Sequence, residues 1–481
     1  MRASNAFPAA MVLAALLAAC ASPRGISTTA SVVRPETLEA ARTLRSAPVS
    51  AEPLAHGWWK RYGDPQLDRL EAEAIEGNPS IGIVRARVEQ AEAAAASARL
   101  ALTPKIEGSA SSSRQRLSKN GLVPPPFGGR WIWQNEATLD FRHELDFWGR
   151  NRKAYEAALG QARAAEVDAQ AARLLLETAV ARAYLQLDAA FDQRDIARST
   201  VGQREHVLSI TRARFDAGLD TQAEVRQAEG AVPASRGEVQ VAQQAIDLAR
   251  NELGALVGQG PDHGLEIHRP ALHPIGVALP STLPADLVGR RPDVVAQRLR
   301  IESAARGIES AKAAFYPNVD LTAFVGLQAL DFPSFLRAGS LTAGAGPAIR
   351  LPLFERGALR AALEARSADW DLAVAQYNET VVGALREVVD QLAALRHLAA
   401  REREAAASLR AAEQGHEISL ARYRAGMGNY LQVLSTEGQV FAARALQADL
   451  RARRLDAGVV LIRALGGGYD AEAPPEAAAR R

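Results

Sequence analysis

The sequence contains one cysteine, few aromatic side chains and no long apolar run in its body. The single cysteine, Cys20, excludes an internal disulfide, so packing has to stabilise the fold. Aromatic residues make up only 5% of a chain that is 48% apolar. Alanine supplies much of the remainder, and this composition favours long, closely packed helices. After the first twenty residues, no stretch approaches the ~18 apolar residues that a transmembrane helix needs.

The chain also lacks a strong charge imbalance and a recognisable catalytic motif. Its 57 basic and 55 acidic residues give a net charge of +2, and no basic run or basic-aromatic cluster indicates nucleic acid as a partner. His263, His268 and His273 recur every five residues, but they fall in a Pro/Gly-rich segment without cysteine or a set of acidic ligands, so a surface loop is expected there instead of a metal site. The glycines at 466–468 lack the Lys-Ser/Thr of a phosphate loop. We therefore expect no enzyme activity, no metal and no cofactor.

The first twenty residues are expected to be a targeting segment. Arg2 precedes a short apolar core at residues 7–17, and Leu17-Ala18-Ala19-Cys20 resembles the bacterial lipobox, whose cysteine is acylated after cleavage. Residues 1–19 are thus predicted to be a lipoprotein signal peptide and 20–59 an extended segment anchored by covalent lipid on Cys20. Ala21 follows the cysteine, which by resemblance to bacterial lipoproteins points to the outer membrane. An ordinary secretory signal with a chance cysteine is the alternative.

An internal repeat organises the rest of the chain. Residues 213–230 match 421–438 at a constant offset of 208, and residues 79–104 match 292–317 at an offset of 213. The chain is therefore predicted to contain one unit twice, at 60–265 and 283–470, with a connector at 266–282 and a flexible tail at 471–481.

Each unit contains a predicted pair of strands, at 105–145 and 318–353. Apolar and polar residues alternate with period two, and loops rich in turn residues separate the members of each pair. Four strands of about ten residues can cross a membrane when tilted, but a closed barrel needs about eight. Several chains must then share one barrel. Three copies would contribute twelve strands, although the count alone also permits two or four copies.

Aromatic residues lie at the ends of the first strand pair, where a membrane interface would place them: Trp131, Trp133, Phe141, Phe147 and Trp148. Packing of these side chains within a soluble sheet is the alternative, because the same alternation occurs in a sandwich.

A long helical hairpin follows each strand pair, at 150–258 and 356–465. The first helix of each hairpin has no proline, and apolar residues step by four and three along it, which is typical of a coiled-coil seam. An unbroken helix of this length spans roughly 100 Å. Gly218 and Gly426 are expected to end these helices in the left-handed conformation and to mark the tips of the hairpins. Pro233 should kink the first returning helix.

Several runs resemble the TolC-like outer membrane factor family, in particular its NodT-type efflux lipoproteins. The most specific is Leu-Pro-Ala-Asp-Leu-Val-Gly-Arg-Arg-Pro-Asp-Val at 283–294, and others lie at 144–150, 311–318 and 385–388. The resemblance covers essentially the whole mature chain. It implies a mixed α/β membrane protein: a homotrimer with a twelve-stranded outer-membrane β-barrel that continues into a long α-helical coiled-coil barrel across the periplasm.

The same resemblance implies a function. We expect the outer-membrane channel of a tripartite efflux system, with a periplasmic adaptor, an inner-membrane pump of the RND type and outer-membrane lipid as partners, exporting small molecules. A duct for type I protein secretion shares the fold and is a second hypothesis. A structural coiled-coil lipoprotein that tethers the envelope is a third, although it would need neither the strands nor the repeat.

The hairpin tips are the expected gate and adaptor-docking site, by resemblance to the family. The residues assigned to them are Arg214, Phe215, Gly218, Asp220, Glu224, Arg422, Tyr423, Gly426, Asn429 and Tyr430. Family members usually have an aspartate just after the second turn, whereas this chain has Val433-Leu434-Ser435-Thr436 there. The negative charge of a constriction would then come from Asp220 and Glu224, or from Glu229 and Glu437.

Overall fold

The computed structural model describes residues 24–34, 38, 49–50, 56–273, 279–280, 291–352 and 354–469. Cys20, the signal peptide, most of the 283–294 run and the tail after 470 lie outside these residues, so the expectations about them stay predictions. The chain divides into two compact units, and each takes segments from both repeats. The first is built around Arg87–Ala165 and Ala296–Tyr377, and the second around Glu166–Val295 and the segment after Asn378.

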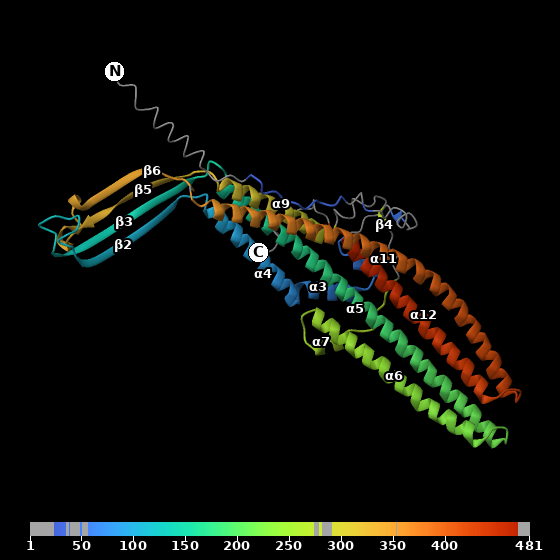
Figure 1. Cartoon of the computed structure of the whole chain (residues 1–481). Helices are drawn as coiled ribbons and strands as arrows, with labels where there is room; N and C mark the ends of the chain where they lie inside the picture. Colours follow the sequence, from blue (N-terminus) through green and yellow to red (C-terminus); the bar gives the residue numbers. More distant parts are fainter. Residues whose placement is uncertain are drawn as a thin grey trace. The chain divides into compact units, whose positions relative to one another are not determined.

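The first unit holds an antiparallel sheet of four strands (Figure 1). Its order is β2-β3-β5-β6, and the bounds are β2 Lys105–Arg116, β3 Trp131–Leu145, β5 Asn318–Ala329 and β6 Leu341–Arg350. Each predicted strand pair is a hairpin, and β3 pairs with β5 to join the two repeats. The outer edges of β2 and β6 have no strand beside them among the described residues.

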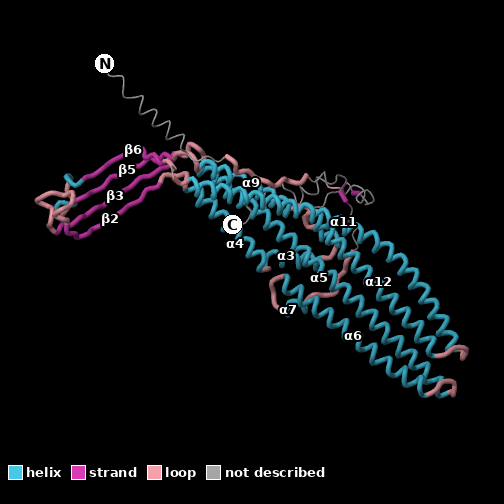
Figure 2. The backbone as a smooth tube through the Cα atoms, in the orientation of Figure 1, coloured by secondary structure: helices cyan, strands magenta, loops and turns pink. Residues whose placement is uncertain are grey.

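The two faces of this sheet differ in polarity. Its four strands lie side by side (Figure 2). Because residues paired across neighbouring strands lie on the same face of a sheet, the register assigns each side chain to one of the two faces. One face carries apolar residues, with Leu139 opposite both Gly108 and Val325, and Leu327 opposite Leu341. The other face carries mainly polar residues such as Glu107, Asp140 and Asp320. Many apolar side chains are exposed, Leu139 at 57% among them.

Small residues allow close helix packing in the first unit, as the alanine-rich composition predicts. Two related helices, α4 Pro79–Leu100 and α9 Pro292–Ala313, precede the strand pairs. Ser303 on α9 donates its hydroxyl proton to the carbonyl of Ala157 at 2.7 Å. Ala157 and Gly160 belong to the start of the long helix α5 Arg150–Asp216. A Cβ on Gly160 would lie 3.0 Å from the Cβ of Ser303, so α5 and α9 meet where only a glycine fits easily.

The second unit contains most of the helical hairpins, including both turns. The elements of these hairpins are α5 Arg150–Asp216 with α6 Gln222–Leu256, and α11 Arg356–Arg424 with α12 Tyr430–Ala464. The first residues of α5 and α11 belong to the first unit. The predicted seam of α5 is buried throughout: Leu176, Val180, Ala183, Leu187 and Ala190 are all less than 8% exposed. Pro233 lies inside α6, which continues past it to Leu256. No helix among the described residues has the length and apolar character to cross a membrane.

Several short elements were not predicted. Trp58 and Trp59, the last residues of the segment expected to be extended, open a 3-10 helix instead, η2 Trp58–Tyr62, whose aromatic side chains are buried in the core. The remaining short elements are α3 Pro65–Gly77, α7 Pro261–Leu265, α10 Phe332–Phe335, η3 Ala338–Ser340 and a two-residue parallel pair of β1 Val49–Ser50 with β4 Leu279–Pro280. The chain thus has six strands among its described residues, four of them in the predicted sheet.

Candidate functional site

The turn of the first hairpin is built by backbone caps. After α5 ends at Asp216, Gly218 adopts a left-handed φ of 75°, and the Leu219 N–H donates to the Arg214 carbonyl at 2.8 Å. Thr221 then begins α6 with a capping box, in which Glu224 accepts the Thr221 backbone N–H at 2.7 Å. Glu224 therefore serves to start a helix.

The second hairpin turns in the same way. Gly426 has a φ of 76°, and the Met427 N–H donates to the Arg422 carbonyl at 2.9 Å. Asn429 caps α12 by accepting the N–H of Gln432 at 2.9 Å. Both glycines thus end a helix where the repeat predicts, and the side chains that differ between the turns must carry any difference in role.

One ion-paired group, which we name the tip lock, joins the two hairpins: Arg214, Asp220 and Tyr423. The Arg214 guanidinium donates to both carboxylate oxygens of Asp220, each at 3.0 Å, and to the backbone carbonyl of Tyr423 at 2.6 Å. Tyr423 in turn donates its phenol proton to Asp220. The guanidinium also lies over the Tyr423 ring, 4.3 Å from its centroid. Arg214 and Asp220 come from the first hairpin and Tyr423 from the second.

Apolar packing holds the tyrosine of the tip lock in place. Tyr423 is fully buried, and its ring lies 6.4 Å from that of Tyr430. Val207 and Val433 complete the cluster, and the hydroxyl of Thr211 lies 3.1 Å from the Tyr423 oxygen. The sequence analysis did not assign Thr211 to the tips, because nothing in the sequence indicates that a threonine inside a helix makes such a contact.

The electrostatics of the tip lock favour the ionised aspartate. Partial burial opposes ionisation of Asp220, but hydrogen bonds from Arg214 and Tyr423 and the arginine's charge outweigh it and lower the pKa of the carboxyl. Burial, together with the bond to Asp220, raises the pKa of Tyr423 to about 12. The tyrosine therefore stays a donor at neutral pH.

The other predicted tip residues are placed differently. Phe215 is 41% exposed and Arg422 is exposed, although their repeat equivalents, Tyr423 and Arg214, belong to the tip lock.

The remaining candidate carboxylates also have partners. Glu229 accepts from Arg212 at 2.8 Å and from Arg226 at 2.9 Å. Glu437 is only 2% exposed, with Arg204 3.7 Å away, and burial raises its pKa. Neither carboxylate is left unpaired at the surface of the tips.

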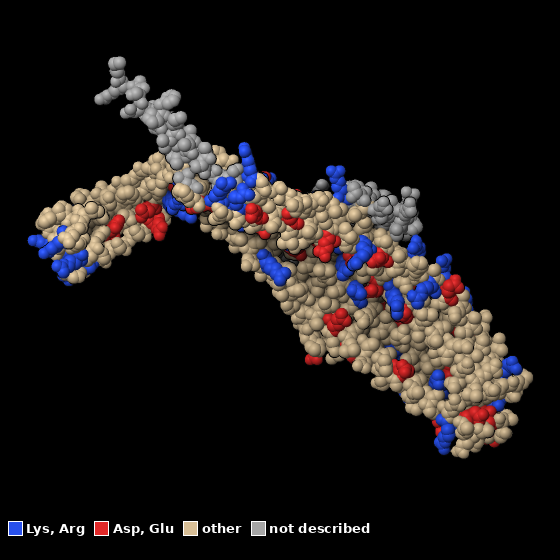
Figure 3. Space-filling view, viewed as in Figure 1, with Lys and Arg blue, Asp and Glu red and all other residues tan. Residues whose placement is uncertain are grey.

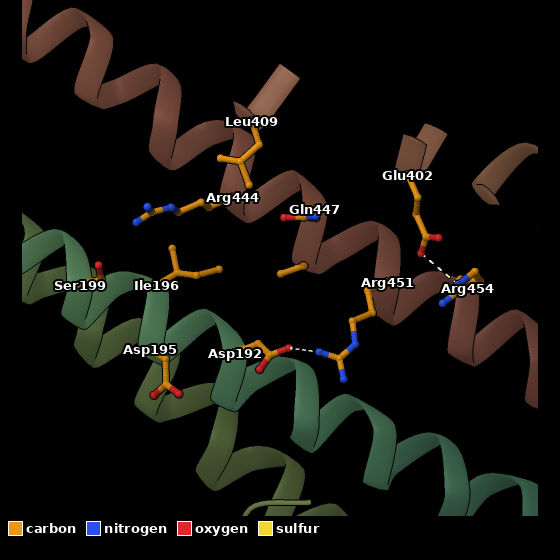
Figure 4. Close-up of a pocket in the computed structure, with 11 residues that line it drawn as sticks. Asp192, Asp195, Ile196, Ser199, Glu402, Leu409, Arg444, Gln447, Arg451 and Arg454 are labelled. Carbon is orange, nitrogen blue, oxygen red and sulfur yellow. Dashed lines mark hydrogen bonds and ion pairs between the residues drawn. The ribbon is translucent and has the colours of Figure 1, made fainter. Parts of the chain in front are cut away.

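A charged groove lies farther along the hairpins, lined by residues of α5, α11 and α12 (Figure 4). Asp192 and Arg451 point toward one another across it at 3.2 Å, and Glu402 pairs with Arg454 at 3.0 Å. The groove therefore presents acidic and basic side chains in alternation, and it lies entirely within the second unit.

Two of the sequence runs that resemble the TolC-like family, at 283–294 and 385–388, meet at Arg291, together with the end of α12. Its guanidinium donates to Asp293 at 2.7 and 3.0 Å, to Glu387 at 2.9 Å and to the carbonyl of Ala464 at 3.1 Å. Arg463 also pairs with Glu387. Burial opposes ionisation of Glu387, but the two arginines outweigh it and lower its pKa. The runs are therefore joined by a structural network in the second unit.

Two histidines of the predicted surface loop contact residues that are distant in the sequence. His263 lies 2.9 Å from Glu73, and the His273 ring lies 3.2 Å from the Tyr62 carbonyl. No group of three or more potential ligand side chains that could hold a metal occurs in the described part of the chain.

Comparison with known proteins gives one consistent result. The family model described as outer membrane efflux protein matches residues 70–259 and 283–467. The chain is 42% identical to the fusaric acid resistance protein FusA of Burkholderia cepacia over 75% of this chain and 69% of that protein. It is 31% identical to the pyoverdine export outer membrane protein OpmQ of Pseudomonas aeruginosa over 86% and 88%. The crystal structure of the outer membrane protein VceC from Vibrio cholerae matches with a TM-score of 0.81 and 34% identity, over 87% of this chain and all of that one.

Proposed function

The chain belongs to the outer membrane efflux protein family, and we propose that it is the exit channel of a tripartite pump that moves small molecules from the periplasm to the exterior. The family is one of outer-membrane channels and not of enzymes. The fold and the efflux function expected from the sequence are confirmed by this family membership and by the structural match. The observation that carries the proposal is the four-stranded sheet, which has one exposed apolar face and whose two edges have no neighbouring strand in the described part of the chain.

A trimer completes the pore in this proposal. An open sheet edge is not tolerated in lipid, because its N–H and C=O groups would have no partners. Pairing β2 of one chain with β6 of the next satisfies both edges, and three chains of four strands then form a closed barrel of twelve. The long hairpins of the three chains form a helical barrel in the same assembly.

The tips form the gate in this proposal. Opening requires the two hairpins of a chain to move apart, and the tip lock opposes this movement because Arg214 and Asp220 bind Tyr423 across the hairpins. Gating then needs only the exchange of these hydrogen bonds for others.

The adaptor docks at the tips and along the hairpins, and an inner-membrane pump of the RND type supplies the energy. Exposed apolar side chains at the turns support this assignment, since Phe215, Leu219 and Met427 are 41%, 61% and 68% exposed. The groove lined by Asp192, Glu402 and Arg451 offers alternating charges to a partner helix. A covalent lipid on Cys20 anchors the chain to the outer membrane.

Single-channel recording tests the proposal. Purified protein is added to a planar bilayer, and discrete conductance steps are expected that grow when the tip lock is broken. A silent bilayer from a preparation that runs as a folded trimer would leave the structural tether as the better reading. Chemical crosslinking of the full chain with candidate adaptors in cells then identifies the partner, and mass spectrometry of the N-terminal peptide detects the lipid.

A further inference from the structure

Basic residues gather at one end of the sheet, which we name the loop end and define by residues 113–134. This segment contains Arg114, Arg116, Lys119 and Arg130 and no acidic residue. All four side chains are exposed. Figure 3 shows blue side chains clustered at this end of the sheet, whereas red ones lie toward its other end.

The two arginines on β2 lie on the apolar face of the sheet. Arg114 is directly opposite Trp133 and Arg116 is opposite Trp131, so all four side chains share the face that carries Leu139. The sequence did not reveal this basic-aromatic cluster, because its members are 15 to 19 positions apart and meet only through the register of the hairpin. In the proposed channel this face contacts lipid, so the inference below rests on the proposed function.

Local contacts hold the cations at this position. The Arg114 guanidinium lies 5.8 and 6.0 Å from the ring centroids of Trp131 and Trp133. Arg116 donates its Nε proton to the carbonyl of Gly129 at 3.3 Å. The aliphatic stem of Lys119 also lies against Gly129, since a Cβ there would be 2.6 Å from the lysine Cγ. Arg116 and Lys119 are therefore neighbours.

No carboxylate neutralises this group among the described residues. The register and the loops place two acidic residues at this end of the sheet, Glu136 on β3 and Asp331 in the loop after β5. Glu136 follows Asn135 on β3 and lies on the polar face, opposite Ser111. Asp331 caps the short helix α10, where it accepts the N–H of Ser334 at 2.8 Å. Arg114 and Arg116 thus keep guanidinium protons available for another acceptor.

We propose that the loop end binds the phosphate groups of lipid headgroups in the outer leaflet. Tryptophan rings prefer the interface between hydrocarbon and headgroup, which places Trp131 and Trp133 at that depth. The arginines beside them then lie at headgroup level, where a planar guanidinium matches phosphate oxygens in a bidentate fashion. Lys119 and Arg130, which lie on the loop between β2 and β3, add positive charge to the same end of the sheet. The preferred lipid carries phosphomonoesters, because the four basic side chains of the loop end have no carboxylate partner among the described residues and favour a headgroup of high negative charge.

Lipid binding by the detergent-purified full-length trimer tests the proposal. Native mass spectrometry counts bound molecules of lipid A with two phosphates, of the same lipid with its phosphates removed, and of inorganic phosphate. The double variant R114Q/R116Q is compared with K105Q/R350Q, which removes two exposed cations from the opposite face at the other end of the sheet. Each basic residue near an anionic lipid surface contributes about a factor of five to binding.

The affinity for diphosphorylated lipid A should therefore fall about 25-fold in R114Q/R116Q and stay unchanged in K105Q/R350Q. Equal losses in the two variants, or equal binding of the dephosphorylated lipid, would overturn the inference. Inorganic phosphate that displaces the lipid at millimolar concentration would identify a free-phosphate site and overturn it as well. Conductance of the same preparations in a planar bilayer decides the proposed function separately, because a channel can conduct without any lipid preference.

Discussion

Replacing Asp220 by asparagine should open the channel. Asp220 accepts three hydrogen bonds, two from Arg214 and one from Tyr423, and the Arg214 and Asp220 side chains are only 11% and 7% exposed. The asparagine keeps one acceptor oxygen but loses the charge and the bidentate pair. A hydrogen bond to a charged group contributes about 1.5–3 kcal/mol, so the closed tip should lose about 2–3 kcal/mol per chain. This loss changes the ratio of closed to open tips by roughly 30- to 150-fold.

Single-channel recording in a planar bilayer measures this change as a longer open time and a larger mean conductance. In cells, the same variant should admit a bulky antibiotic that the wild-type outer membrane excludes. Asp216→Asn is the matched control, because Asp216 is exposed and lies only four residues away. Arg422→Gln is a second control, since Arg422 is the exposed repeat equivalent of Arg214.

Wild-type conductance of Asp220→Asn, or equal opening of the channel by the two controls, would refute a role of the tip lock in closing the channel. The variant Tyr423→Phe adds a double-mutant cycle. If the phenol donates to Asp220 in the closed tip, the effects of the two substitutions should be less than additive, because each removes the same bond.

Three further predictions concern stability, measured by thermal unfolding of the purified protein. Gly218→Ala should destabilise the turn by only about 1–2 kcal/mol, the cost of a left-handed alanine, since no atom beyond the adjacent residues lies within 4 Å of the added Cβ. Gly258→Ala should cost clearly more, because its Cβ would lie 2.1 Å from the carbonyl oxygen of Gly77; equal losses would contradict the packing. Glu387→Gln should lower the melting temperature. The pKa of Glu387 in the folded protein is lowered from 4.5, so the stability that its ionised form contributes is present above pH 4.5. This stability is lost as the pH falls through the folded pKa, and the variant should lack this part of the acid transition. Glu71→Gln should raise stability at pH 7. Burial is the largest cause that raises the pKa of Glu71 well above 4.5, and the charges of Glu177 and Asp68 add to it. The wild type therefore loses stability as the pH rises from 4.5, and the variant should not show this pH dependence.

The sequence predicted the sheet well because its physical signal is local. Alternation with period two marks each strand directly, and the predicted pair at 318–353 contains β5, β6 and the segment between them. The ends of the long helices were equally accessible, since Gly218 and Gly426 both take the left-handed conformation that ends a helix. The 3-10 helix at Trp58 was missed because burial of a tryptophan depends on distant partners.

The tip lock could be predicted only as a set of residue types. Arg214 and Tyr423 were both assigned to the tips, but 209 positions separate them and no local pattern indicates that they touch. The role of Glu224 was also open, because a glutamate three residues after Thr221 fits either a capping box or a charged constriction. Only the backbone geometry distinguishes these two roles.

Duplication of the sequence does not duplicate the tip lock. At the offset of 208, Asp220 corresponds to Gly428, and a Cβ there would meet the backbone N of Tyr423 at 3.2 Å. Arg422 therefore has no aspartate at the position equivalent to Asp220, while Phe215 has no hydroxyl to offer in place of that of Tyr423. The first half supplies the charged pair and the second half the tyrosine, so each chain holds one lock between its hairpins and a trimer holds three. An opening movement that displaces the α5/α6 turn against the α11/α12 turn breaks every lock, whereas one that carries both hairpins of a chain together breaks none.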